Sequence, residues 1–319
     1  MIVDLPDTTT AKISKALVRI REEGGAVALG RVLTLIIAAE LGHEEEAIEA
    51  ANDASREHPM RVIVLSTEAA AAADCAPRVD AEIRVGGDAG ASEVIVLRAY
   101  GDAASDPESL VTGLLLPDAP VVAWWPGQAP EIPAESPLGQ IAYRRITDAS
   151  AQPDPQAALT QICSSYRPGD TDFAWTRLTL WRAQLAAVLD QPPYETITEV
   201  SVTGALDSPS TTLLAAWLQL ALKVPVHYEL TSGENSNGIH GVHLTRASGV
   251  ISLEREVPGI ATLTQSGQPV QDLTLKRRSL RDCLSDELRR LDPDELYGQV
   301  ITQGLPQLDG TAAPTEARS

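Results

Sequence analysis

The chain has 319 residues, of which 44% are hydrophobic and only 4% are aromatic, and it carries a formal net charge of −19. This length is sufficient for two domains with packed cores, built mainly from Ala, Val, Leu and Ile. A strongly acidic surface repels phosphate backbones and anionic lipids. We therefore expect a globular protein that binds neither nucleic acid nor membranes.

The cysteines and the N-terminus indicate the compartment. Cys75, Cys163 and Cys283 lie far apart and form no C-x-x-C pair, which fits a reducing cytosol. The first residues lack a basic segment followed by an apolar one, so we expect no signal peptide. No apolar run reaches the roughly 18 residues of a membrane span. These features predict a cytoplasmic protein.

The first elements in chain order predict a βαβ unit. Asp7 is placed to cap a helix whose apolar residues recur at helical spacing. A continuous apolar run at 30–40 predicts a strand buried on both faces. Residues 43–59 follow as a helix and 60–66 as a second buried strand. A strand, a helix and a strand in this order imply a parallel pair.

The remaining elements of the first half predict an α/β domain over residues 1–167, with a mixed sheet flanked by helices. We expect strands at 80–87, 92–100 and 120–125, a helix at 106–117, a short helix and a strand within 136–150, and a helix at 157–164. The turn-rich stretch 166–172 marks the boundary to the next domain.

The second half predicts a smaller α+β domain over residues 168–305. We expect helices at 173–190, 208–222 and 280–290, a strand at 196–204, and a run of antiparallel strands to residue 256, followed by one at 260–264. Ser279 and Asp282 form a capping-box pattern, and Asp292-Pro293 predicts a last helix that ends at Gly304. Residues 306–319 are small and polar, and we expect a disordered tail.

The usual catalytic motifs are absent from the sequence. The first strand–helix junction reads AAELGHEEE, with three Glu where a dinucleotide site has a G-x-G-x-x-G turn. The stretch GENSNGIH has P-loop glycine spacing but lacks the Lys and the Ser or Thr, which favours a hairpin loop. No G-x-S-x-G elbow occurs. His240 and His243 would point to opposite faces of a strand, which argues against a metal site.

Two basic clusters stand out against the acidic background. Arg144 and Arg145 form one, and the other comprises Lys276, Arg277, Arg278 and Arg281. One interpretation is that these are solvated charges at the ends of elements. The other is that they are docking points for an acidic partner surface or a phosphate.

The adjacent Trp124 and Trp125 lie in the segment PVVAWWPG. On a strand the two side chains point to opposite faces. One of the two side chains is therefore easily buried, whereas the presence of the other needs a separate explanation.

Six segments, in this order, resemble one known family. They read GAVALGRVLTLIIAAE, EAANDASREHPMRVIVLS, LLLPDAPVVAWWPGQAP, SPLGQIAYRRITDAS, YRPGDTDFAWTRLTLWRAQLAAVLDQPP and ELRRLDPDELY. The chain resembles, over roughly residues 1 to 303, the OpcA family of glucose-6-phosphate dehydrogenase assembly proteins from actinobacteria and cyanobacteria.

The resemblance implies a role without catalysis. Such proteins bind glucose-6-phosphate dehydrogenase of the oxidative pentose phosphate pathway and promote its assembly or active state. The family brings no catalytic residues, no cofactor and no metal to carry over. In photosynthetic relatives the effect is linked to thiol redox state, but the cysteines here form no close pair.

Under this resemblance, the Trp pair becomes a candidate partner anchor. Large rigid side chains beside a fixed turn lose little entropy on docking. We expect Trp124 or Trp125, with Pro126 and Gly127, to contact the dehydrogenase, and we add Trp175, Arg144 and Arg145 as further candidates. The competing expectation is that both Trp belong to the core. Two other functions stay open, an enzyme acting on a sugar phosphate and a scaffold for several enzymes.

Overall fold

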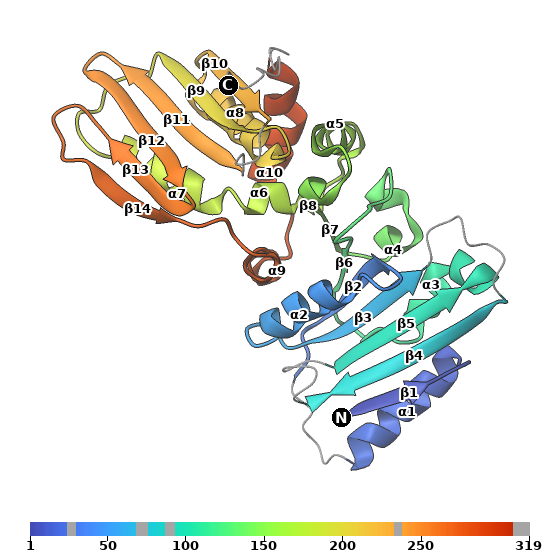
Figure 1. Cartoon of the computed structure of the whole chain (residues 1–319). Coiled ribbons are helices and arrows are strands. Elements are labelled where there is room, and N and C mark those ends of the chain that lie inside the picture. Colours follow the sequence, from blue (N-terminus) through green and yellow to red (C-terminus); the bar gives the residue numbers. More distant parts are fainter. Residues whose placement is uncertain (24–29, 68–75, 87–92, 233–237, 309–319) are drawn as a thin grey trace. The chain divides into compact units, whose positions relative to one another are not determined.

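The computed structural model describes residues 1–23, 30–67, 76–86, 93–232 and 238–308 (Figure 1). Contacts divide the chain into two compact units. Unit 1 comprises Met1–Asp148, Gly169–Thr171 and Ser279–Pro293, and unit 2 comprises Ala149–Pro168, Asp172–Arg278 and the residues from Asp294 onward. The domain boundary at 167/168 stays a prediction, and the expected disordered tail lies, from residue 309 on, outside the described residues.

Among the described residues, the first sheet has eight strands in the order β1-β4-β5-β3-β2-β6-β7-β8. The five neighbouring strands from β5 to β7 run parallel, whereas β4 is antiparallel to β5 and β1 is antiparallel to β4. The strands are β1 (Ile2–Leu5), β2 (Leu33–Glu40), β3 (Met60–Thr67), β4 (Arg78–Val85), β5 (Glu93–Tyr100), β6 (Val121–Trp124), β7 (Arg144–Thr147) and β8 (Asp170–Asp172).

The expected βαβ unit is confirmed. Strand β2, helix α2 (Glu45–Ala54) and strand β3 follow one another, and β2 pairs with β3 in parallel register from Leu33↔Met60 to Glu40↔Thr67. Both strands are buried over almost their whole length. Apolar, largely β-branched side chains that alternate between two covered faces account for these uninterrupted apolar runs.

One face of this sheet packs against α1 (Thr10–Glu23). The helix buries Ile13, Leu17 and Ile20 in a cluster with Ile36 and Ile63 of the sheet. Its cap differs from the expected one. The backbone amide of Asp7 donates to the Asp80 carboxylate, and the hydroxyl of Thr9 accepts from the Lys12 amide at 3.4 Å. The helix begins at Thr10, so Thr9 occupies the cap position and the expectation that Asp7 caps the helix is wrong.

Helix α9 (Leu280–Arg289) belongs to unit 1 although it lies near the C-terminal end of the sequence. It packs beside α2, and the His58 ring lies 3.1 Å from the Ser285 carbonyl oxygen. The expected capping box is confirmed: the Ser279 hydroxyl accepts from the Asp282 amide, and the Asp282 carboxylate accepts from the Ser279 amide.

In the described part of unit 2, the second sheet has six strands in the order β10-β9-β11-β12-β13-β14. The strands are β9 (Glu199–Ala205), β10 (Val226–Thr231), β11 (Ile239–Arg246), β12 (Gly249–Val257), β13 (Gly259–Thr264) and β14 (Gln271–Leu275). The expectation of antiparallel strands is wrong for β10, which pairs with β9 in parallel. Helix α8 (Pro209–Leu222) connects β9 to β10 and returns the chain to the sheet edge at which β9 begins. Strand β9, helix α8 and strand β10 therefore form a second βαβ unit.

The helices of unit 2 cover one side of this sheet with a large apolar core. The expected helix over 173–190 is divided into α6 (Phe173–Thr176) and α7 (Thr179–Leu189). Helix α8 is buried over nine of its residues, which explains its almost uniformly apolar sequence. Further helices are α5 (Pro155–Ser165) and α10 (Glu295–Gln299), the latter followed by a π-helical turn. The prediction of an α/β fold with a smaller C-terminal sheet domain is confirmed.

Candidate functional site

The carboxyl edge of the parallel strands in unit 1 is where this topology places a ligand. From β2 the chain proceeds to β3 and β5 on one side, and then returns to β6 and β7 on the other. The order therefore reverses between β2 and β6. In open α/β sheets, ligands bind in the crevice at this reversal, beyond the carboxyl ends of the strands.

The side chains at the β2–α2 junction disfavour the binding of a phosphate there. The cap residue Glu44 offers no side-chain cap, and Glu45 and Glu46 occupy the first helical turn. Glu44 is buried and its carboxylate accepts from Arg98 at 3.1 Å and from the hydroxyl of Ser66. Three carboxylates stand where a dinucleotide site presents bare amides and a helix dipole to a pyrophosphate. The crevice therefore cannot hold a dinucleotide in the usual manner.

Trp124 and Trp125 lie at the end of β6 and are both buried, with 0% and 4% of their surface exposed. Trp125 shares a face with Val121 and Ala123 and belongs to the cluster under α1, so Trp124 points to the opposite face. The turn residues Pro126 and Gly127 are half-buried. This packing agrees with the competing expectation that both Trp belong to the core. Partner binding by this segment stays a prediction.

A pocket borders the ring of Trp125, and we name it the Trp125 pocket. The space in it that is open to the centre of a water-sized group is about 190 Å³. Its lining is mostly apolar. Ala38 and Leu65 come from β2 and β3, Pro107 from the segment after β5, and Trp125, Pro130 and Leu138 from the proline-rich segment after β6. The sequence indicated only Trp125 of this set, although the recurring prolines after β6 were a usable signal of a rigid loop.

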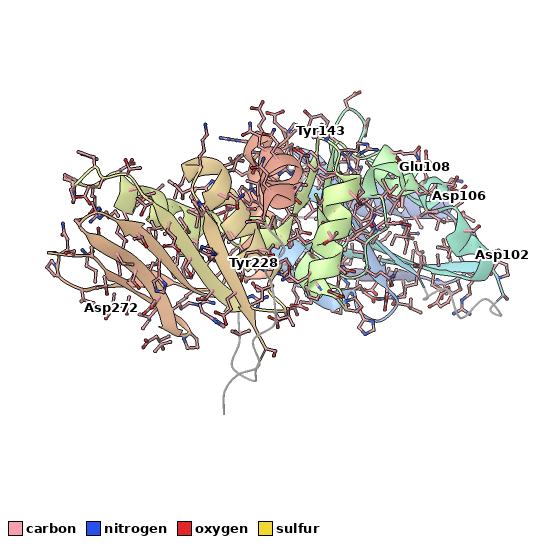
Figure 2. All side chains as sticks on the ribbon, turned by 90° about the horizontal axis from the view of Figure 1, so that it is seen from above. Asp102, Asp106, Glu108, Tyr143, Tyr228 and Asp272 are labelled. Atoms are coloured by element: carbon pink, nitrogen blue, oxygen red, sulfur yellow. The ribbon has the colours of Figure 1, made fainter. Side chains whose placement is uncertain are left out.

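Acidic residues stand next in sequence to two residues that line the Trp125 pocket. Ala104 and Pro107 line the pocket, and the exposed side chains of Asp102, Asp106 and Glu108 lie beside them in sequence (Figure 2). Asp106 caps α3 (Pro107–Thr112), and its hydrogen bonds with Ser109 lower its pKa. The Asp106 carboxylate therefore stays charged at neutral pH. An apolar pocket with acidic residues on a neighbouring segment fits a partner surface of apolar and basic side chains.

Arg144 and Arg145 are buried inside unit 1, so the expectation of solvated charges is wrong for this cluster. The guanidinium of Arg144 binds the Glu287 carboxylate and donates to the Asp292 carbonyl at 2.7 Å, and so ties the segment around α9 to strand β7. Arg145 pairs with Asp170 and donates to the Ala142 carbonyl. Each pair is enclosed, and desolvation of these charges is offset by hydrogen bonds.

Trp175 lies in the core of unit 2, with 1% of its surface exposed. Its indole N–H donates to the Asp294 carboxylate at 2.8 Å, and its ring lies 5.7 Å from that of Tyr297. The guanidinium of Arg182 covers the other side of the ring at 3.7 Å. These contacts connect α6 to α10, and partner binding by Trp175 stays a prediction.

The two cysteines among the described residues, Cys163 and Cys283, form no disulfide. Burial raises the pKa of the Cys163 thiol, which donates to the Ile301 carbonyl. A protonated, half-buried thiol of this kind is a poor nucleophile. Cys75 lies outside the described residues.

In the described ranges, no three His, Cys, Asp or Glu side chains are grouped so as to hold a metal ion. None of the helices in the same ranges is both long and apolar enough to cross a membrane.

Solved structures resemble this chain only distantly. A 3-ketoreductase from Actinomadura kijaniata shares 10% identity with a TM-score of 0.43, covering 90% of this chain and 100% of its own. A glucose-6-phosphate 1-dehydrogenase from Mycobacterium avium shares 10% identity with a TM-score of 0.41, covering 90% of this chain and 94% of its own. At such values neither likeness supports a conclusion about this protein.

The family models are more informative. No curated protein matches the chain. Residues 51–164 match the N-terminal domain of the glucose-6-phosphate dehydrogenase subunit, and residues 168–301 match its C-terminal domain, both in the OpcA family. The two matches cover most of the chain and confirm the resemblance carried by the six segments. The chain belongs to the OpcA family of glucose-6-phosphate dehydrogenase assembly proteins.

Proposed function

We propose that this protein is a non-catalytic effector that binds glucose-6-phosphate dehydrogenase and promotes its oligomeric, active state in the pentose phosphate pathway. The observation that carries the proposal is the match of both halves of the chain to domains of the glucose-6-phosphate dehydrogenase subunit. The acidic β2–α2 junction supports it, because it removes the phosphate cradle from the crevice where an α/β enzyme would hold a dinucleotide.

The Trp125 pocket is the surface we assign to the dehydrogenase. It is concave, mostly apolar and framed by proline-containing segments, so little conformational entropy is lost when a side chain of the partner enters it. The acidic residues on the neighbouring segment, Asp102, Asp106 and Glu108, add electrostatic steering toward a basic partner face. On this proposal Trp125 shapes the floor of the contact, and the half-buried Pro126-Gly127 turn holds its ring in place.

An effector acts only if it binds one state of its partner better than another. The dehydrogenase from the same organism is therefore titrated with this protein, with activity and elution volume in size-exclusion chromatography followed together. The expected result is a saturable rise in activity together with co-elution, and no turnover by this protein alone. If neither activity nor elution changes at any ratio, the proposed function is wrong.

Pro137→Glu tests the assigned surface. Pro137 is an exposed pocket residue at the first position of α4 (Pro137–Gln140), where a carboxylate suits the helix dipole. We expect the carboxylate to weaken binding at least about tenfold, because the partner would strip its hydration on entering the apolar pocket, and this cost exceeds the attraction to a basic face. Pro155→Glu is the matched control, because Pro155 has the same position at the start of α5 in unit 2. Equal binding by both variants would place the contact elsewhere.

A further inference from the structure

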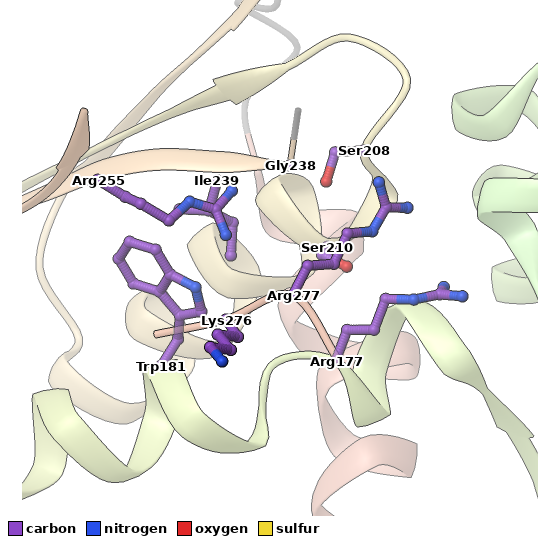
Figure 3. A pocket seen from close by; sticks show the side chains of 9 residues that line it. All are labelled: Arg177, Trp181, Ser208, Ser210, Gly238, Ile239, Arg255, Lys276 and Arg277. Atoms are coloured by element: carbon purple, nitrogen blue, oxygen red, sulfur yellow. The ribbon is translucent and has the colours of Figure 1, made fainter. Parts of the chain in front are cut away.

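A small cationic pocket lies in unit 2, at the start of α8 (Figure 3). Helix α8 follows the carboxyl end of β9 after a three-residue connection, so the pocket occupies the strand–helix junction of the second βαβ unit. Its floor includes Ser208, Ser210 and Trp181, and its cations are Arg177, Arg255, Lys276 and Arg277. The last two belong to a basic cluster that is visible in the sequence and that the proposed function does not use.

Arg255 and Arg277 form the cationic part of this pocket. Arg255 comes from β12 and reaches in beside Trp181 and Ile239, whereas Arg277 comes from the segment after β14 and extends toward Ser208 (Figure 3). Arg177 directs its guanidinium away from them (Figure 3). Among the described residues no carboxylate forms an ion pair with Arg277 or with its neighbour Lys276. Their charge therefore stays available to a ligand.

The two guanidiniums repel each other. Burial lowers the pKa of Arg255, and the positive charge of Arg277 lowers it further. Burial lowers the pKa of His240 on the adjoining strand, and the negative charge of Asp207 opposes this effect. The exposed Asp207, beside Ser208, is therefore an acidic group near this pocket. A bound dianion would relieve the repulsion between Arg255 and Arg277.

The start of α8 adds further groups that suit an anion. The cap residue Ser208 makes no side-chain cap, and the first helical position is Pro209. Pro209 has no N–H and the Thr211 amide donates to the Ser208 carbonyl at 3.0 Å, so the Ser210 amide is the first-turn N–H that no side chain caps, at the positive end of the dipole of this 14-residue helix. The Ser210 hydroxyl donates to the Ala174 carbonyl at 2.7 Å, which fixes the position of this turn in the core.

The size of the pocket selects the group that enters. The space open to the centre of a water-sized group is about 30 Å³, compared with roughly 10 to 15 Å³ for one water. This fits a phosphoryl group and not a whole nucleotide. We propose that Arg255, Arg277 and the start of α8 form a binding site for the phosphate group of a small phosphate monoester, such as a sugar phosphate. The site lies on a different unit from the Trp125 pocket and goes beyond the proposed function.

The test is isothermal titration calorimetry on the full chain without dehydrogenase, so its result does not depend on the proposed function. The probes are inorganic phosphate, glucose 6-phosphate and AMP, at low and at physiological salt. We expect saturable binding of phosphate and of the sugar phosphate, weakened by salt. The first two probes distinguish free phosphate from an esterified source. Binding of AMP alone would show that the base is recognised, and would overturn the proposal.

Arg277→Gln removes one ligand at an exposed position, so the fold is retained. We expect it to weaken phosphate binding about tenfold or more, the usual effect of a lost charge-assisted hydrogen bond. Arg255→Gln should act in the same direction. Arg167→Gln removes an equal charge from an exposed part of unit 2 outside the pocket, and should change binding less than about twofold at physiological salt. No binding by the native chain, or equal losses in all three variants, would overturn the proposal.

Discussion

The protein contains two strand–helix junctions of the same design with opposite charge. In unit 1, β2 leads into α2, whose cap and first turn are Glu44, Glu45 and Glu46. In unit 2, β9 leads into α8 through Ser208, and Arg255 and Arg277 stand beside it. A helix start attracts anions through its amides and dipole. The comparison shows that neighbouring side chains decide whether this attraction is used, because three carboxylates outweigh it and two guanidiniums reinforce it.

The two units also differ in how their charges are satisfied. In unit 1 the buried Glu93 carboxylate accepts ion pairs from Arg61 at 2.6 Å, Arg21 at 3.0 Å and Arg31 at 3.5 Å. Burial alone would raise the pKa of Glu93, but the Arg21 hydrogen bond and the three cationic charges outweigh it and lower that pKa. Charges in this network stabilise the fold, whereas Lys276 and Arg277 of unit 2 form no ion pair with a carboxylate of the described residues. Four predictions test this difference.

The largest effect is expected for Glu93→Gln. The substitution leaves the buried Arg61 guanidinium without a counter-charge, which should lower the free energy of unfolding by about 3–5 kcal/mol. Urea unfolding followed by circular dichroism measures it. Asp53→Asn is the control, since Asp53 pairs, within the described part of the chain, with the exposed Arg56 and Arg281, and the change should cost less than about 1 kcal/mol. Similar losses of unfolding free energy in both variants would show that the ion pairs of Glu93 stabilise the fold no more than an exposed ion pair does.

A similar loss is expected for Trp124→Ala. The Trp124 side chain is completely buried in unit 1, so its truncation should lower the free energy of unfolding by about 3–5 kcal/mol, through lost burial and the cavity that remains. Thermal unfolding with and without the substitution measures this. Tyr194→Ala, at a side chain with 79% exposure, should stay within about 0.5 kcal/mol of the native protein. An unaltered melting temperature for Trp124→Ala would mean that the ring is not packed as described.

A smaller effect follows from pH. Because folding lowers the pKa of Glu93, its contribution to stability is complete above the ordinary value of 4.5 and is lost as the pH falls from that value through the lowered pKa of the folded state. The difference in unfolding free energy between the native chain and Glu93→Gln should therefore narrow between pH 7 and about pH 3. Urea titrations at both pH values measure it. A gap that widens at low pH would give the opposite sign and contradict the network.

The smallest effect on stability is expected for Arg277→Gln. The side chain is exposed and repels Arg255, so its removal should change the free energy of unfolding by less than about 0.5 kcal/mol. The same variant should lose phosphate binding. A large loss of stability would instead make Arg277 part of the fold and remove the contrast between the two units.

The sequence by itself determined the local elements and the family. Apolar periodicity located most strands and helices, the Ser279–Asp282 pattern marked the start of α9, and six ordered segments identified the OpcA family. These signals are local, because capping, turns and side-chain alternation depend on residues a few positions apart. The acidic β2–α2 junction was also readable, since it lies within one short stretch.

The tertiary structure decided the contacts between distant residues. It assigned α9 to unit 1 through Arg144 and Glu287, which are 143 positions apart. It also buried Trp124, Trp125 and Trp175, and made β10 parallel to β9. The pocket at α8 combines Ser208, Arg255 and Arg277 from three separate segments. No local pattern encodes such meetings, because they depend on which faces the whole chain must cover to bury its apolar surface.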